Sequence, residues 1–180
     1  MVCGLTAGLT FAPLSAWAGK LDVSIGYFQI NAQVAGRTGS ISNFGLGQLA
    51  YRHALTDQFE ATLGYSIVMS SGIGGELGYG LDLGLNWYPF TNAAPRETAT
   101  PSFSFVLDEQ WRPYVGPYFY QRQYPRVQTG YAGVGLEAGV ERSISSRMSL
   151  KPSARFMLLS GPKSAAANEL DLMIGLSFQF

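Results

Sequence analysis

Apolar and polar side chains alternate along most of the chain after residue 18, and this period of two is typical of strands with two different faces. The pattern is clearest at 77–88. One face there consists of Leu77, Tyr79, Leu81, Leu83, Leu85 and Trp87, and the other of Gly78, Gly80, Asp82, Gly84, Asn86 and Tyr88. Similar alternation predicts further strands at about 20–33, 40–55, 59–69, 111–122, 132–141, 148–158 and 170–180. The chain is therefore expected to be all-β, with eight strands.

The length and the faces of these strands favour a barrel in a membrane over a soluble sandwich, whose strands also alternate. The predicted strands exceed the roughly 5–6 residues typical of soluble proteins. They also reach the ~9–11 residues that cross a bilayer at a tilt. The sequence contains no convincing amphipathic helix to cover the apolar faces, and the opposite faces are small and polar, as in a barrel lumen. We expect an eight-stranded antiparallel up-and-down transmembrane β-barrel.

Three of the predicted strands are less regular than the others, at about 20–33, 40–55 and 111–122. The segment 20–33 changes phase near Tyr27 and Phe28, which predicts a β-bulge. The segment 111–122 contains Pro113 and Pro117, which have no N–H group to donate to a neighbouring strand. We therefore expect the pairing of this strand to lack ladder hydrogen bonds at the two prolines.

The lengths of the connections distinguish the two ends of the barrel. Short turns at Thr56-Asp57-Gln58 and at Ser143-Ile144-Ser145-Ser146 belong to the end with both termini, and loops near 34–39, 70–75, 123–128 and 160–167 to the other. The terminal end should carry a girdle of interfacial aromatic residues, formed by Tyr51, Phe59, Trp87, Trp111, Phe178 and Phe180. A long connection at 89–110 lies at the same end, where it could dock a periplasmic partner, although an irregular loop is the preferred interpretation.

Strand parity also places nine charged side chains inside the predicted barrel. Four are basic and five are acidic, namely Arg52, Arg112, Lys151 and Arg155 with Glu60, Asp82, Glu137, Glu141 and Asp171. Buried charges persist only when they are paired or hydrated. This near balance favours a salt-bridged and mostly closed lumen over a selective pore, which would favour an excess of one sign. Eight strands also leave little free bore.

Tyrosine rings on one strand and glycines on its two neighbours are predicted to complement each other in size inside the lumen. Tyr114, Tyr118 and Tyr120 point inward from one strand. The two neighbouring strands carry inward glycines at Gly78, Gly80, Gly84, Gly133, Gly135 and Gly139. We expect the rings to lie across the glycine backbone and to fill the interior. A dinucleotide-binding glycine loop is excluded because no helix follows these glycines.

The first 18 residues are typical of a signal peptide. Residues 2–15 are apolar and small, and Ala16-Trp17-Ala18 is a small-x-small cleavage site, although no Lys or Arg precedes the apolar stretch. We expect a signal peptide at 1–18 and a barrel domain at 19–180; the alternative is a short buried helix that stays attached. Cys3 is the only cysteine, so the mature chain would have neither a disulfide nor a thiolate.

The overall composition agrees with a lipid-facing exterior. Charged residues make up only 13% of the chain, about half of the roughly 25% usual for soluble proteins. The 12 basic and 12 acidic residues cancel, so the chain has no basic excess that would favour a nucleic acid as partner.

The C-terminal sequence Ile174-Gly175-Leu176-Ser177-Phe178-Gln179-Phe180 resembles the terminal β-signal of bacterial outer-membrane proteins. The phrase from Tyr51 to Phe59, followed by Leu63-Gly64-Tyr65, is similar to small eight-stranded barrels of the OmpA transmembrane, OmpX and OmpW types. The resemblance implies export to the cell outer membrane. It implies contact with outer-membrane lipid and lipopolysaccharide, and recognition of Gly175, Phe178 and Phe180 by the assembly machinery.

Three functions remain open at this point. The preferred hypothesis is a structural, anchoring or partner-binding envelope protein with a largely plugged interior. The alternatives are a narrow passive channel for small or hydrophobic solutes and a lipid-A-modifying enzyme. The enzyme is disfavoured because the only histidine, His53, is predicted to face lipid near the rim without an adjoining serine motif. No catalytic residue, cofactor or metal site is predicted.

Overall fold

The computed structural model describes residues 19–34, 37–70, 76–90, 111–124, 129–162 and 165–180. The predicted signal peptide and most of the 89–110 connection lie outside the described residues. Within the described part of the chain, no helix is long and apolar enough to cross a bilayer.

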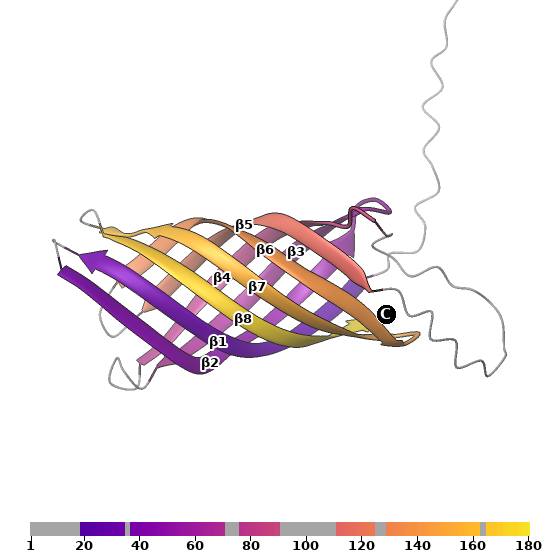
Figure 1. The fold of residues 1–180 in the computed structure, drawn as a ribbon, viewed down its shortest axis with the longest axis horizontal. Helices are drawn as coiled ribbons and strands as arrows, with labels where there is room; N and C mark the ends of the chain where they lie inside the picture. The colour runs from indigo at the N-terminus through magenta and orange to yellow at the C-terminus, as the bar shows by residue number, and fades with distance from the viewer. Residues whose placement is uncertain (1–18, 35–36, 71–75, 91–110, 125–128, 163–164) are drawn as a thin grey trace, which may run out of the picture.

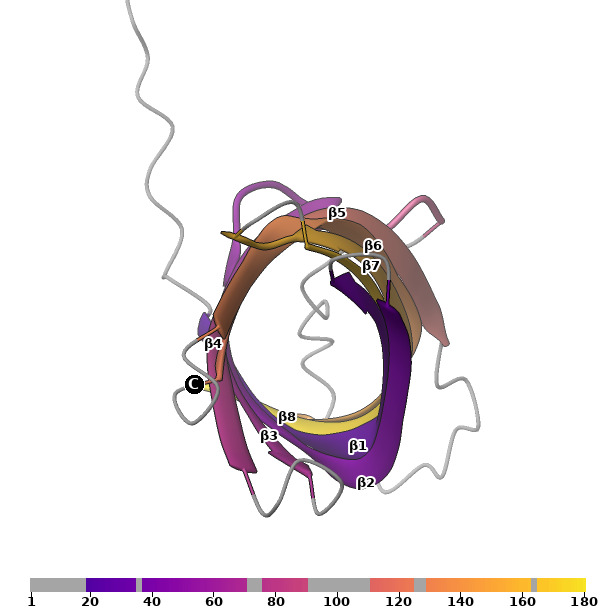
Figure 2. The same cartoon turned by 90° about the vertical axis from the view of Figure 1, so that its left-hand side faces the viewer.

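Eight antiparallel strands form a closed barrel, as the alternation predicted (Figure 1). Each strand pairs with its neighbours in chain order, and β1 pairs with β8 to close the ring (Figure 2). The strands are β1 (Gly19–Val34), β2 (Arg37–Ala54), β3 (Phe59–Ser70), β4 (Glu76–Trp87), β5 (Arg112–Tyr124), β6 (Thr129–Ser145), β7 (Met148–Ser160) and β8 (Ala166–Gln179).

We call the end of the barrel with both chain termini the terminal end, and the opposite end the loop end. The Phe180 N–H donates to the Gly19 carbonyl at 3.2 Å, so the two ends of the described chain meet there. At the β2–β3 turn, the hydroxyl of Thr56 accepts hydrogen bonds from two following backbone N–H groups. The sequence prediction of a short turn at this place is confirmed.

Other predicted connections were too long. β6 continues to Ser145, so the tight turn consists of Ser146 and Arg147 rather than residues 143–146. A register shift between Ser143 and Ser145 absorbs the extra residue, which allows the serine-rich segment to remain in the strand. At the loop end, the strands likewise extend into the predicted loops at 34–39, 123–128 and 160–167.

The predicted bulge exists, but the extra residue belongs to β2 instead of β1. The β1–β2 register shifts between Gly26 and Phe28, whereas the β1–β8 register runs without a break. Phe44 and Gly45 of β2 therefore both lie opposite Tyr27. β1 keeps one phase throughout, and the sequence suggested a change only because its inward side chains become apolar from Phe28 onward.

The prolines of β5 affect one edge of that strand. Against β6, the pairing is continuous from Arg112 to Tyr124. Against β4, the pairing skips from Gly84↔Tyr118 to Trp87↔Val115. The gap includes Pro117, which has no N–H group to donate. The gap agrees with the expected loss of a ladder hydrogen bond at Pro117, whereas the pairing with β6 is unbroken at Pro113.

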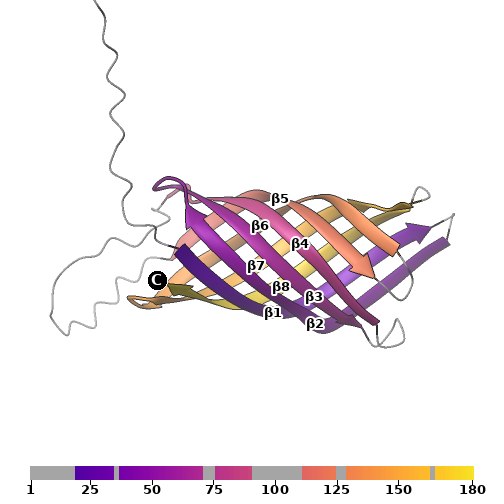
Figure 3. The ribbon, with the colours of Figure 1, turned by 180° about the vertical axis from the view of Figure 1, so that it is seen from behind.

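The two faces of the sheet are opposite in character to those of a soluble protein. Large apolar side chains point outward from every strand, and Leu81 and Leu172 are each 48% exposed. Charged and hydrogen-bonding side chains point inward and are buried. The view from behind shows the same single wall of strands, and none of the described residues forms a second layer over β3 and β4 (Figure 3). Apolar side chains that no other protein layer covers suit a hydrocarbon environment.

Aromatic residues gather at the terminal end of this outer face. Phe59 and Trp87 are direct register partners, and the rings of Tyr51 and Phe180 are 6.4 Å apart. The indole of Trp111 lies 4.9 Å from the Arg142 guanidinium. Aromatic rings in such a position suit the boundary between hydrocarbon and water.

Candidate functional site

The interior of the barrel contains thirteen buried charged side chains among the described residues. All nine that parity placed inside are buried there. Four more were not predicted, namely Lys20, Asp22, Arg122 and Glu169. The interior thus contains six basic and seven acidic groups, a near balance of charge.

Arg52 of β2 is the centre of the network near the terminal end. Its guanidinium donates to Glu60 at 2.6 Å, to Glu141 at 3.0 Å and to Asp22 at 3.0 Å. The hydroxyl oxygens of Tyr88 and Ser177 accept further hydrogen bonds from it, at 2.8 and 2.7 Å. One fully buried cation therefore serves three carboxylates that come from β1, β3 and β6.

Three further cations surround this centre. Lys20 donates to Glu60 at 2.6 Å, and Arg112 donates to Glu141 at 2.8 Å. The ammonium of Lys151 lies 3.1 Å from Asp22 and 3.4 Å from Glu137. Lys151 thereby connects the terminal-end cluster with a second cluster in the middle of the barrel.

The middle cluster is built around Asp82 of β4. Its carboxylate accepts hydrogen bonds from Arg122 at 2.5 Å, from Gln48 at 2.6 Å and from the Ser66 hydroxyl. Arg155 donates to Asp82 at 3.3 Å and, through Nε, to Glu137 at 2.8 Å. These contacts satisfy the charged groups in a place that water reaches poorly.

Several of these contacts cross the bore. Strands four places apart in a ring of eight lie opposite each other, and Arg52 of β2 contacts Glu141 of β6 in this way. Arg155 of β7 reaches Gln48 of β2 and Asp82 of β4, each three strands away. Side chains joined across the ring at two levels occupy the space that an aqueous channel would need.

The three predicted lumen tyrosines are buried, and two of them lie over predicted glycines. A Cβ atom at Gly84 would overlap the ring of Tyr118, and one at Gly139 would come within 2.5 Å of the Tyr114 hydroxyl. Tyr120 stacks on Tyr118 with ring centroids 5.6 Å apart. The glycines at 80, 133 and 135 instead face backbone atoms or other side chains, so the expected complementarity applies to two contacts rather than to the whole stripe.

The loop-end half of the interior is apolar, which the sequence analysis did not predict. Phe28 and Ile30 of β1 pack there with Ala165, which precedes β8, and with inward side chains of other strands, namely Leu46, Val68, Tyr131, Met157, Leu159, Ala167 and Met173. This cluster meets the polar network at Tyr118 and Tyr120. The interior is therefore charged toward the terminal end and mainly apolar toward the loop end, where Arg122, Glu169 and Asp171 are the buried charged residues that lie beside the apolar cluster.

Two carboxylates at this junction are poorly satisfied. Glu169 and Asp171 of β8 are fully buried, and none of their four oxygen atoms accepts a hydrogen bond from the described residues. Their nearest cations are Arg122 and Arg155, at 3.6 to 3.9 Å. A buried carboxylate with only distant partners is expected to cost stability.

This arrangement predicts the effect of removing the Asp171 charge. Asp171→Asn should leave the barrel equally stable or raise its unfolding free energy by roughly 1–2 kcal/mol, because it removes a buried carboxyl group that has no hydrogen-bond partner among the described residues. Urea titration of the barrel folded into detergent micelles measures this change. The matched change Glu137→Gln should lower stability by roughly 2 kcal/mol, since Glu137 accepts charge-assisted hydrogen bonds. Equal losses in both variants would contradict the expectation.

The remaining predicted residues lie on β8 and at the rim. Gly175 is buried against Ser24, whereas Phe178 and Phe180 are exposed on the outer face. His53 also lies near the terminal end, where its ring stacks on outward-facing Tyr51 at 6.5 Å.

Comparisons with known proteins agree with this architecture. No family model matches the chain, and no curated protein matches it in sequence. The structure is similar to Neisserial surface protein A, with a TM-score of 0.60 at 11% identity over 89% of this chain and 97% of that one. It is also similar to the N-terminal β-barrel domain of Pseudomonas aeruginosa OprF, with a TM-score of 0.57 at 14% identity over 91% and 99% of the two chains. The protein thus has the fold of the small eight-stranded outer-membrane β-barrels, which its strand pattern and its C-terminal motif predicted.

Proposed function

We propose that the protein is an integral barrel of the bacterial outer membrane with a closed interior and a structural, anchoring or partner-binding role in the envelope. The observation that carries this proposal is the contrast between the two faces of one sheet. The outer face is apolar and uncovered, and the inner face is filled by ion pairs that cross the bore. Such a molecule is held by lipid and passes few ions.

Planar-bilayer recording on the refolded chain from residue 19 tests the closed interior. We expect no steady conductance steps from the unaltered protein, because Arg52 and Arg155 join opposite walls at two levels. The double variant Arg52→Ala/Arg155→Ala should produce steps, since it removes both crossings. Arg147→Ala, at an exposed turn, is the matched control and should stay silent. Steady conductance of the unaltered protein at the level of the double variant would overturn the proposal.

Export and assembly complete this proposal. Residues 1–18 would direct the chain across the inner membrane and would then be removed. The assembly machinery of the outer membrane would recognise Gly175, Phe178 and Phe180, and the exposure of both phenylalanines at the end of the chain supports such a contact. Lipid and lipopolysaccharide would then surround the apolar belt. A periplasmic partner for 89–110 stays a hypothesis, because most of that segment lies outside the described residues.

One observation favours a second candidate function. The apolar loop-end half of the lumen, around Phe28 and Met157, suits an apolar solute better than an ion. A hydrophobic solute would enter this part of the lumen at the loop end. It would then leave through the barrel wall before it reaches the charged network. Uptake of a hydrophobic dye into liposomes that contain the barrel, without ion conductance, would favour this candidate over the closed barrel.

A further inference from the structure

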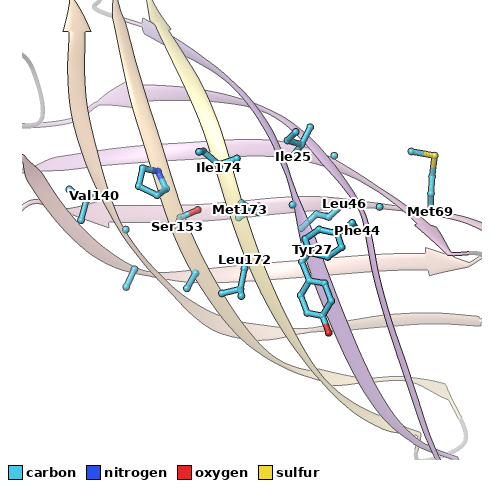
Figure 4. A pocket seen from close by; sticks show the side chains of 17 residues that line it. Ile25, Tyr27, Phe44, Leu46, Met69, Val140, Ser153, Leu172, Met173 and Ile174 are labelled. Atoms are coloured by element: carbon cyan, nitrogen blue, oxygen red, sulfur yellow. The ribbon is translucent and has the colours of Figure 1, made fainter.

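A furrow runs across the outer face of the barrel, from β6 over β7, β8 and β1 to β2 and the end of β3 (Figure 4). Its volume is about 990 Å³. The floor follows one row of register partners, in which Gly139 pairs with Ser153, Ser153 with Met173, Met173 with Gly26 and Gly26 with Leu46. The furrow is therefore a continuous surface groove between two rows of outward side chains.

Small residues and the β2 bulge keep the furrow open. Ala138 and Ala154 are direct partners in one wall, where larger side chains would narrow it. A Cβ atom at Gly47, in the opposite wall, would meet no other atom within 4 Å. At the bulge, Phe44 and Gly45 together face Tyr27, which adds one residue to the width of the furrow.

The furrow is apolar and lies within the outer belt of the barrel. Its walls include Ile25, Leu172 and Ile174, and no charged side chain is among the described residues that line it. The Tyr27 and Phe44 rings, 5.2 Å apart, mark its loop-side border. Beyond this border the next outward residues are Gln29 on β1 and Ser42 on β2, so the furrow has uncharged polar neighbours at its β1–β2 end. On β6 to β8 the apolar belt continues with Leu136, Phe156 and Leu170.

We propose that this furrow binds one acyl chain of a glycerophospholipid and holds it in a fixed position on the barrel. The inference rests on the proposed membrane location, because within a bilayer the belt is covered by hydrocarbon. At ~4.8 Å spacing, the five strands from β6 to β2 give this part of the furrow a length of roughly 19 Å, and one leaflet of a ~30 Å hydrocarbon core is about 15 Å thick. The width of a single row admits one chain. The uncharged polar residues at the loop-side border suit a phospholipid headgroup better than a multiply phosphorylated lipid A.

Native mass spectrometry can test the site. The barrel is folded into dimyristoyl phosphatidylcholine vesicles, extracted into mild detergent and weighed with its bound lipid. We expect one retained phospholipid on the unaltered protein. Gly47→Leu and Ala154→Phe, which fill the furrow from opposite walls, should each reduce this occupancy at least tenfold. Gly39→Leu and Ala61→Phe are the matched controls outside the furrow and should retain the lipid.

The possible outcomes distinguish failure of the proposed lipid site from failure of the proposed membrane location. Heat-modifiable migration in detergent gels reports for every variant whether the barrel has folded into the vesicles. Failure of the unaltered chain to fold into vesicles would overturn the membrane location itself. Folded barrels that retain no lipid, or that all retain it equally, would overturn only the furrow site. A dimer mass that disappears in Ala154→Phe would assign the furrow to a second copy of the chain, and preferential retention of added lipopolysaccharide would assign it to lipid A; either result overturns the proposal.

Discussion

Arg52→Met should destabilise the barrel more than any other single change to its charged interior. The change keeps much of the side-chain volume but removes the cation that Asp22, Glu60 and Glu141 share. Breaking a buried ion pair by removal of one partner typically costs roughly 3–5 kcal/mol. Lys20, Arg112 and Lys151 still pair with the three carboxylates, but each carboxylate loses its hydrogen bond from Arg52. The loss should appear as a lower midpoint in urea unfolding of the folded barrel.

The matched control is Arg147→Met at the exposed β6–β7 turn, which should change the unfolding free energy by less than about 0.5 kcal/mol. A second comparison, Glu60→Gln/Arg52→Met, should recover part of the loss, because it removes one of the carboxylates that has lost its hydrogen bond from Arg52. A loss below about 1 kcal/mol for Arg52→Met would show that water enters the cluster and compensates the charges, which contradicts a closed interior.

The alternation of side chains was enough to predict the ring of eight strands, but not its register. Parity shows that Arg52 and Glu141 both point inward, yet these residues are 89 positions apart in the chain. Which acid meets which base depends on how far neighbouring strands are staggered around the ring. That stagger arises from the closure of the whole sheet, which no local pattern contains.

Each of the four buried charged residues that were not predicted was missed for a reason that lies in its local sequence. Lys20 and Asp22 precede an apparent phase change in β1 that the structure assigns to β2. Glu169 precedes the predicted start of its strand at residue 170. Arg122 continues the inward parity of Tyr118 and Tyr120, so the signal was present, although the prolines made that strand harder to follow.

The apolar part of the lumen could not be predicted from the sequence for a different reason. Near the loop end, inward residues such as Phe28, Met157 and Leu159 are as apolar as the outward ones. Alternation disappears when both faces of a strand are apolar, so the period of two carries no information there. Only the packing of these side chains against each other shows that the interior changes character along the barrel axis.

Tyr118 and Gly84 form the contact in this interior that a double-mutant cycle can measure best. The Tyr118 ring lies where a Cβ of Gly84 would be, and its hydroxyl donates to Asn86 at 2.8 Å. The Arg155 guanidinium covers the ring at 5.4 Å from its centroid. The ring therefore joins the charged cluster, the glycine gap and the apolar cluster, and its removal leaves a cavity at their junction.

Tyr118→Ala should lower the unfolding free energy by roughly 3–5 kcal/mol, as expected for loss of a buried aromatic ring, and Gly84→Ala should lower it by roughly 1–3 kcal/mol through overpacking. The double variant should lose less than the sum of the two, by at least about 1 kcal/mol, because the added methyl group then enters the space that the ring has left. Urea unfolding of all four proteins gives the coupling. Gly39→Ala is the control, since a Cβ there would meet no atom within 4 Å and should cost nothing. Strict additivity of Tyr118→Ala and Gly84→Ala would mean that the ring does not lie over the glycine, and the size complementarity of the lumen would then be wrong at the place where it is most direct.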